Sequence, residues 1–374
     1  MAGARPDGRL RRCRPRHRPA GSGAREWIPA RERRRRVPRA RGHGVTRRVG
    51  AHGPLDRDRE HLRAPERRAP HDHRVTALTP AETREWRAAD GATLRDLVFG
   101  EPGAPPERTL VVVCGAFLPA AIYAPFAAAL VRELGGGWAI HVYDRRGKGG
   151  SSPVDDSYRF DTELSDVRTA LSESGARHVL GHSLGGAIVL HAVRALAAAG
   201  DPLVPESTIV YDPAINLDGS MDAAWLPRFE GYVERRKWGR AAAVVERVMG
   251  RSHTLSRAPS WMVAGVMAVC VRTGLRGMSE SLFPAGAAEL RAAFTEEARA
   301  ADFAHMPSNV CILVGEKSAD YFRATAAALG RAMPDATLVE VRKGIHGSVP
   351  AVRHPIVPAA ARWLRGEPLG DVAR

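Results

Sequence analysis

The sequence predicts an α/β fold, a doubly wound and mostly parallel sheet with a helical segment inserted between the sixth and seventh strands. Two observations predict it. From about residue 75, short and continuously apolar runs alternate with stretches of helical periodicity, which is typical of parallel strands covered on both faces. One interval of about ninety residues, 215–305, is helical in pattern throughout. An interval of that length does not fit a regular strand–helix repeat, so we expect it to form a separate helical layer.

The N-terminal fifth of the chain differs in composition from the rest. Residues 1–74 contain 23 arginines and 8 acidic residues, and therefore carry the whole formal charge of +15 of the 374-residue chain. They are rich in Arg, Pro and Gly and show no periodicity, so we expect a disordered, Arg-rich extension. Its densest part, 31–36, has a composition that could bind nucleic acid. A solvated tail is the simpler interpretation, and nucleic-acid binding by this tail is not expected.

The remaining composition excludes several classes of protein. The hydrophobic fraction of 44% is that of a globular protein, and no apolar run is long enough to predict a membrane span. No apolar segment follows the basic N-terminus, so a secretory signal is not expected. The four cysteines are far apart, without a C-x-x-C pair, which argues against a disulfide framework or a zinc site and favours a reducing cytoplasm. We expect Cys270 and Cys311 to be small buried apolar side chains.

The first half of the sheet follows from the strand signals before the insertion. Residues 85–100 predict two strands around the Asp90-Gly91 turn. Apolar runs that predict buried strands then occupy 109–114, 138–143, 177–180 and 208–211. Helices are expected at 120–134, 161–174 and after Ser183. A Gly-rich turn, 144–151, fits neither a P-loop nor a dinucleotide fingerprint, so we interpret it as a structural connection.

The sheet resumes after the insertion. Residues 309–314 and 337–341 predict the last two strands, with helices at 321–333 and 355–364. We therefore expect a core formed by 75–214 and 306–374, and a helical cap formed by 215–305 over the carboxyl edge of the sheet. The tryptophans and methionines of that interval are expected to form mainly its own core.

A serine between two glycines stands at the centre of this arrangement. Gly181-His182-Ser183-Leu184-Gly185 lies directly between an apolar run and a helix-forming segment. A nucleophile raised on a sharp strand-to-helix turn needs small neighbours two positions away, because its backbone is strained. The helix N-terminus that follows also favours negative charge near the serine hydroxyl. This context predicts a catalytic serine.

From about residue 91 to 366 the chain resembles an α/β-hydrolase with a helical cap. The matching features occur in the order that this family shows: Cys114-Gly115-Ala116 after a strand, the turn 144–151, the serine turn, Tyr211-Asp212-Pro213, the insertion, and Gly344-Ile345-His346. The resemblance implies a serine nucleophile at Ser183 and a histidine base at His346, in the chain order nucleophile, acid, histidine.

The acid that would orient His346 has two candidates. The commoner family pattern places it after the penultimate strand, where this chain has Ser318, with Asp320 two residues later. The less common pattern places it one strand earlier, and Asp212 matches that position. We favour Asp212 and keep Asp320 as the alternative. Asp212 could also be a strand-end carboxylate that binds only local backbone.

The resemblance also implies an oxyanion hole made of backbone N–H groups. Leu184 would give one and Ala116 the other, with Phe117 as an alternative to Ala116. The expected reaction is acyl transfer through an acyl-enzyme on an ester-like, small or medium and largely apolar substrate, with no metal or organic cofactor. C–C bond hydrolysis, lactone opening, cofactor-free perhydrolysis and a non-catalytic ligand-binding role remain open. A serine at 183 argues against epoxide or haloalkane hydrolysis, which need a carboxylate nucleophile.

Overall fold

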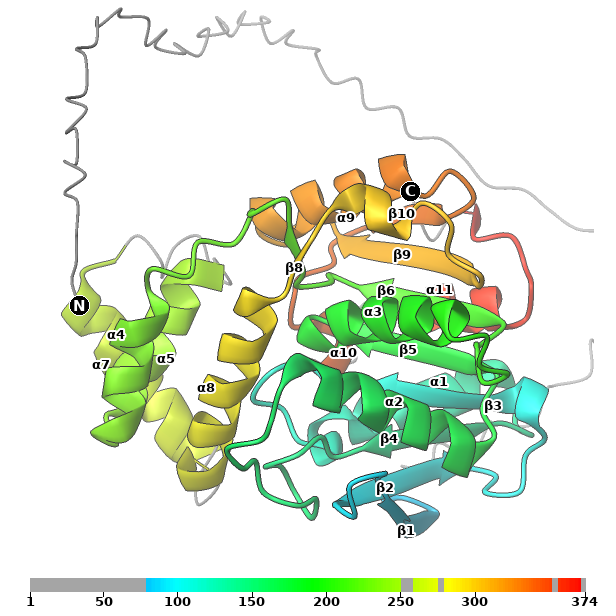
Figure 1. The fold of residues 1–374 in the computed structure, drawn as a ribbon, viewed down its shortest axis with the longest axis horizontal. Coiled ribbons are helices and arrows are strands. Elements are labelled where there is room, and N and C mark those ends of the chain that lie inside the picture. Colours follow the sequence, from blue (N-terminus) through cyan, green and yellow to red (C-terminus); the bar gives the residue numbers. More distant parts are fainter. Residues whose placement is uncertain (1–78, 250–257, 275–278, 352–355, 371–374) are drawn as a thin grey trace, which may run out of the picture. The chain divides into compact units, whose positions relative to one another are not determined.

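The computed structural model describes residues 79–374 except 250–257, 275–278, 352–355 and 371–374 (Figure 1). The predictions for 1–74, that this extension is disordered and that it does not bind nucleic acid, lie outside the described residues.

Within the described residues, eight strands form one sheet. In chain order they are β1 (Glu82–Arg87), β2 (Thr93–Gly100), β3 (Thr109–Val113), β4 (Ala139–Tyr143), β5 (His178–His182), β6 (Ser207–Tyr211), β9 (Asn309–Gly315) and β10 (Thr337–Val341). Their order across the sheet is β1-β2-β4-β3-β5-β6-β9-β10. The β1–β2 and β2–β4 pairs are antiparallel and the other neighbours are parallel. The predicted fold class, a mostly parallel sheet with helices, is confirmed.

Helices cover both faces of the sheet. They are α1 (Ala124–Leu134), α2 (Phe160–Ser174), α3 (Leu184–Ala198), α9 (Asp320–Ala332), α10 (Ser348–Ala351) and α11 (Ile356–Leu364), with short 3-10 turns at Pro106–Arg108, Ala120–Tyr123 and Ala300–Phe303. In Figure 1, α2 and α3 lie in front of the sheet, whereas α1 and α11 lie behind it.

The side chains of β3 show why its sequence is continuously apolar. Val111 and Val113 belong to the core that contains the inward faces of α2, α3 and α9, whereas Leu110 and Val112 belong to the core under α1 and α11. All four are fully buried. A strand buried on both faces cannot alternate polar and apolar residues, which is the pattern that predicted it.

The chain leaves the sheet after β6 and returns to it at β9. In between it forms α4 (Leu226–Glu234), α5 (Trp238–Met249), α7 (Ser260–Gly274) and α8 (Ser279–Thr295). Two short strands, β7 (Asn216–Leu217) and β8 (Glu297–Ala298), pair in parallel and bring the two ends of this insertion together. The insertion has its own apolar cluster, which includes Phe229, Phe283 and Phe294.

Two predictions about side-chain burial had different outcomes. Cys311 on β9 is buried, as expected, but Cys270 is exposed, so that prediction is wrong. The reason is that α7 turns Val263 and Val271 inward, while Trp261 and Val269 on its other side are 77% and 61% exposed. In the described part of the chain, no helix combines the length and apolarity needed to cross a bilayer.

Candidate active site

Ser183 lies on the turn between β5 and α3, with a backbone that L residues rarely adopt. Its φ is 57° and its ψ is −123°. A non-glycine residue in such a region persists only when its surroundings fix it. The Ser183 N–H donates to the Tyr211 carbonyl, and the Ser183 carbonyl accepts the Ala214 N–H. The turn is therefore fixed against the last residue of β6 and the segment that follows it.

The two glycines that bracket Ser183 are needed for close packing. A Cβ at Gly181 would overlap the backbone of Gly185, and a Cβ at Gly185 would overlap the Val113 carbonyl at the end of β3. Both glycines have ordinary φ values, so their role here is space rather than conformation. The Gly-x-Ser-x-Gly pattern is thus explained by the approach of α3 to β3 and β5.

Asp212 and His346 are brought together at the carboxyl edge of the sheet. Asp212 follows β6 and is fully buried. Its Oδ2 lies 3.2 Å from His346 Nδ1, and its Oδ1 accepts the Gly315 N–H at 3.0 Å. Ser318 donates its hydroxyl to Asp212 Oδ2. The carboxylate is therefore held by two donors, with the imidazole as a third neighbour.

Ser318 has a role that sequence reasoning did not assign to it. The serine occupies the position where a carboxylate was sought, and it supports the carboxylate that lies one strand away. The alternative acid, Asp320, begins α9 and is exposed. The structure gives Asp212, and not Asp320, a contact with His346.

The loop that carries His346 is fixed from three sides. The Tyr211 hydroxyl donates to the Ile345 carbonyl at 2.7 Å, and the His346 ring stacks on Phe322 with centroids 4.0 Å apart. His182 Nε2 lies 2.9 Å from the His346 carbonyl oxygen. Because His182 directly precedes Ser183, this last contact places the His346 loop beside the serine turn.

His182 is a second residue whose role the sequence did not reveal. The ring bridges two segments, with Nδ1 2.7 Å from the Tyr123 hydroxyl and Nε2 2.9 Å from the His346 carbonyl oxygen. The ring is 2% exposed. The only feature of the sequence that pointed to His182 was its position directly before Ser183.

The loop after β3 passes close to Ser183. A Cβ at Gly115 would lie 3.2 Å from Ser183 Cβ. In this loop the Gly115 N–H donates to the Tyr123 hydroxyl at 2.8 Å, and the Phe117 N–H faces a Glu289 carboxylate oxygen at 3.4 Å. Those two N–H groups have acceptors inside the protein, which favours Ala116 over Phe117 as a donor to a ligand. Leu184 is the first residue of α3, where N–H groups lack helical acceptors.

A buried ionic cluster lies against this loop. Arg145 and Lys148 come from the turn after β4, Glu163 from α2 and Glu289 from α8, and each is at most 1% exposed. Arg145 Nη2 lies 2.5 Å from Glu289 Oε1 and 3.5 Å from Glu163 Oε1. Lys148 Nζ also contacts Glu289 Oε1. The interpretation of the turn 144–151 as a structural connection did not include these ion pairs.

Burial and charge act in opposite directions on these groups. Burial alone would raise the pKa of the Glu289 carboxyl, but the nearby Arg145 and Lys148 charges outweigh it and hold that pKa below its ordinary value. Burial, followed by repulsion from Arg145, lowers the pKa of the Lys148 ammonium. The two basic side chains thus favour the ionised form of the Glu289 carboxyl.

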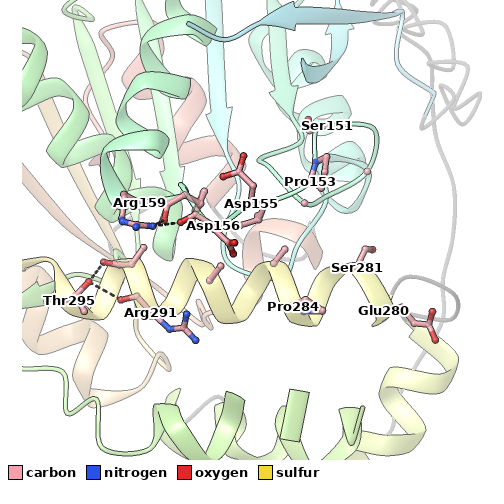
Figure 2. Close-up of a pocket in the computed structure, with 17 residues that line it drawn as sticks. Ser151, Pro153, Asp155, Asp156, Arg159, Glu280, Ser281, Pro284, Arg291 and Thr295 are labelled. Atoms are coloured by element: carbon pink, nitrogen blue, oxygen red, sulfur yellow. Dashed lines mark hydrogen bonds between the residues drawn. The ribbon is translucent and has the colours of Figure 1, made fainter. Parts of the chain in front are cut away.

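A separate cavity of about 880 Å³ lies on another side of α8 (Figure 2). Its wall is formed by the segment 147–159 and by residues 280–295. Figure 2 shows Asp155, Asp156 and Arg159 on one side and Arg291 on α8 on the other. Ser183, Asp212 and His346 do not line it, so this cavity is distinct from the candidate catalytic residues. Among the described residues, no group of three or more His, Cys, Asp or Glu side chains could hold a metal ion.

Comparisons with known proteins give a family and a fold. The model of the alpha/beta hydrolase family matches residues 110–361. An alpha/beta hydrolase from Sphaerobacter thermophilus is similar in structure, with a TM-score of 0.58 and 20% identity over 75% of this chain and 99% of that one. An esterase from Exiguobacterium antarcticum gives a TM-score of 0.55 and 15% identity over 76% and 100% of the two chains.

A bromoperoxidase from Bacillus anthracis is also similar, with a TM-score of 0.54 and 17% identity over 73% of this chain and 96% of that one. No curated protein matches this chain in sequence. At such identities the structural likeness shows the fold alone.

Proposed function

The chain belongs to the alpha/beta hydrolase family, and from this premise we propose that it is a serine hydrolase that cleaves ester-like bonds through an acyl-enzyme. The observation that carries the proposal is the contact between Asp212 and His346, on a loop that is hydrogen-bonded to the residue next to Ser183. The strained backbone of Ser183 supports the same role, because such strain is typical of functional sites.

In the proposed reaction, Ser183 Oγ attacks the carbonyl carbon of the ester while His346 takes the hydroxyl proton. The same proton then passes to the leaving alkoxide, and the acyl group stays on Ser183. Water attacks this acyl-enzyme, with His346 taking its proton, and the acid and the free serine are released. Asp212 keeps a proton on Nδ1 of the imidazole, so that the other ring nitrogen can act as the base.

Charge that develops on the carbonyl oxygen needs donors in fixed positions. The proposed donors are the backbone N–H groups of Ala116 and Leu184. The N-terminus of α3 adds a favourable field at the same place. A serine where the commoner family pattern has the acid would favour a non-catalytic role, but the hydrogen bond from Ser318 to Asp212 supports Asp212 as the acid.

The insertion 215–305 is proposed as a cap that forms part of the substrate site. Its apolar cluster packs against Ala116 and Phe117, the residues next to the proposed oxyanion donor. Phe229 and Phe283 lie 5.9 and 5.8 Å from the Phe117 ring, measured between centroids. Surroundings of this kind support a small or medium, largely apolar acyl or alcohol group.

A panel of p-nitrophenyl esters of graded chain length tests the proposal. Wild type should hydrolyse at least one of them, and Ser183→Ala should lose nearly all turnover while keeping its fold. Ser174→Ala, at the end of α2, is the matched control and should keep wild-type rates. Equal turnover by wild type and Ser183→Ala would refute the proposed function.

A further inference from the structure

One carboxylate on the insertion connects three separate segments of the chain. Glu289 lies on α8 and is 1% exposed. Its Oε1 contacts Arg145 and Lys148, from the turn after β4. Its Oε2 lies 3.4 Å from the Phe117 backbone nitrogen, in the loop after β3. The serine hydrolase mechanism proposed above does not use any of these three charged side chains.

Stability alone does not explain the charges. Removing a carboxylate and two cations from water is expensive, and apolar residues of similar volume often stabilise a protein as well or better. The cluster is also imperfectly satisfied, because Nε and Nη1 of Arg145 are buried without a hydrogen-bond acceptor in the described part of the chain. We therefore look for a role of this cluster in holding the segment that it contacts, the loop that contains Phe117.

The segment it contacts is strained. Phe117 has a φ of 62°, a backbone region that non-glycine residues adopt only when their surroundings fix it. The same helix that holds the Phe117 N–H also holds its ring, because a Cβ at Gly286 would overlap that ring. On the other side of Ala116, the Gly115 N–H is held by Tyr123. Ala116 is therefore fixed from both of its neighbours.

The charges also matter for the reaction itself. A bare carboxylate next to a loop that must stabilise an oxyanion would oppose the developing negative charge. Arg145 and Lys148 on the other carboxylate oxygen offset that effect. The cluster can thus hold the Phe117 N–H with a strong acceptor without placing an uncompensated negative charge near Ser183.

We propose that Glu289 is a positioning residue, which fixes the loop Gly115-Ala116-Phe117 so that the Ala116 N–H is aligned for the oxyanion formed at Ser183. The proposal rests on the serine hydrolase function proposed above. It makes the helical insertion part of the transition-state machinery as well as a cover, since the position of α8 sets the position of the donor.

The experiment compares Glu289→Gln with wild type, using the full chain, p-nitrophenyl butyrate as substrate and phenylboronic acid as a probe of the tetrahedral state. One oxyanion donor is worth about 10²–10³ in kcat, so displacing it should lower kcat by about 10-fold or more. KM should change by less than about threefold, because the ester ground state gains little from this donor. The affinity for phenylboronic acid should fall together with kcat.

Two further variants separate positioning from general destabilisation. Glu230→Gln breaks the exposed ion pair between α4 and Arg291 on α8, and it should leave kcat unchanged. Gly286→Ala keeps every charge and raises the helix propensity of α8, but the added Cβ displaces the Phe117 ring. This variant should therefore lower kcat with little change in KM, as Glu289→Gln should. The rates are divided by the concentration of active sites, which is measured by burst titration. A smaller folded fraction therefore does not appear as a lower kcat.

The outcomes are distinct. A wild type without turnover would refute the proposed function, and this inference with it. A working wild type, together with Glu289→Gln and Gly286→Ala variants whose kcat stays within twofold, would overturn this inference alone. A loss that appears only in KM, with unchanged affinity for phenylboronic acid, would overturn it too.

Discussion

The Asp212→Asn substitution tests the proposal that Asp212 orients His346, because the two oxygens of this carboxylate have different partners. Asp212 Oδ1 accepts a backbone N–H from Gly315, whereas Oδ2 faces both the Ser318 hydroxyl and His346 Nδ1. The asparagine oxygen should stay with the Gly315 N–H, because the backbone donor cannot turn. The amide NH₂ then takes the place of Oδ2, and Ser318 can rotate its hydroxyl to accept from it.

His346 cannot adapt without changing its protonation. An NH₂ group that faces Nδ1 requires a lone pair there, so the proton moves to the other ring nitrogen and the base toward Ser183 is lost. A wrong tautomer of this kind costs about 10⁴ in kcat, or about 5.5 kcal/mol at about 1.36 kcal/mol for each tenfold change. Because the variant keeps the buried hydrogen bonds, it should remain folded.

The assay is the hydrolysis of p-nitrophenyl butyrate by purified full-length protein, with far-UV circular dichroism as the check of folding. Asp320→Asn is the matched control, since that carboxylate is exposed at the start of α9, and its kcat should stay within about twofold of wild type. A loss below tenfold in Asp212→Asn, or a larger loss in Asp320→Asn, would mean that Asp212 does not orient His346.

Three other predictions concern groups around the site and the core. Ser318→Ala removes a charge-assisted hydrogen bond worth about 1.5–3 kcal/mol, and should lower kcat about tenfold at unchanged KM by releasing Asp212. Burial lowers the pKa of His191 to about 4, from an ordinary value of about 6.5. The unfolded chain therefore takes up a proton first as the pH falls, and between pH 7 and 5 this should lower the free energy of unfolding by about 2 kcal/mol. His191→Leu should remove that part of the pH dependence in urea titrations. Gly185→Ala should lower the free energy of unfolding by at least about 2 kcal/mol, because a Cβ would overlap the end of β3. Gly265→Ala, a helical site with open space around it, should raise it by about 0.5–1 kcal/mol.

Each of these three predictions would be contradicted by a specific result. Equal kcat for wild type and Ser318→Ala would mean that the hydroxyl does not hold the carboxylate. An unchanged pH slope in His191→Leu would place the acid sensitivity elsewhere. Equal stabilities for Gly185→Ala and Gly265→Ala would contradict the packing explanation of the serine turn.

The elements of the core could be predicted because their signals are local. The apolar run 109–114 became β3, and the Asp90-Gly91 turn separates β1 from β2, as expected. The serine turn was equally visible, since its two glycines are required by contacts only a few residues away and by one neighbouring strand. Local sequence thus specified which segments form strands and where the turn that carries Ser183 lies.

The choice between Asp212 and Asp320 needed long-range information. Asp212 gains its partners because β6 pairs with β9, which brings Gly315 and Ser318 to the carboxylate. The sequence shows neither this pairing nor its register. It could equally not show the buried ionic cluster, in which Lys148 and Glu289 are 141 residues apart along the chain.

The prediction that Cys270 is buried was wrong for a related reason. An apolar residue on a helix is buried only if its face meets another element, and α7 presents that face to solvent. The helix α7 is apolar nearly all round. Its sequence therefore does not show which of its sides is buried.

In the proposed mechanism, His346 activates Ser183 as the nucleophile. Reaction of the full-length protein with a fluorophosphonate, followed by mass spectrometry to locate the adduct, measures this activation. A single adduct is expected on Ser183, absent from Ser183→Ala and formed at least about 100-fold more slowly in His346→Gln. A folded protein whose Ser183 takes no label, or a His346→Gln variant that reacts at the wild-type rate, would contradict it.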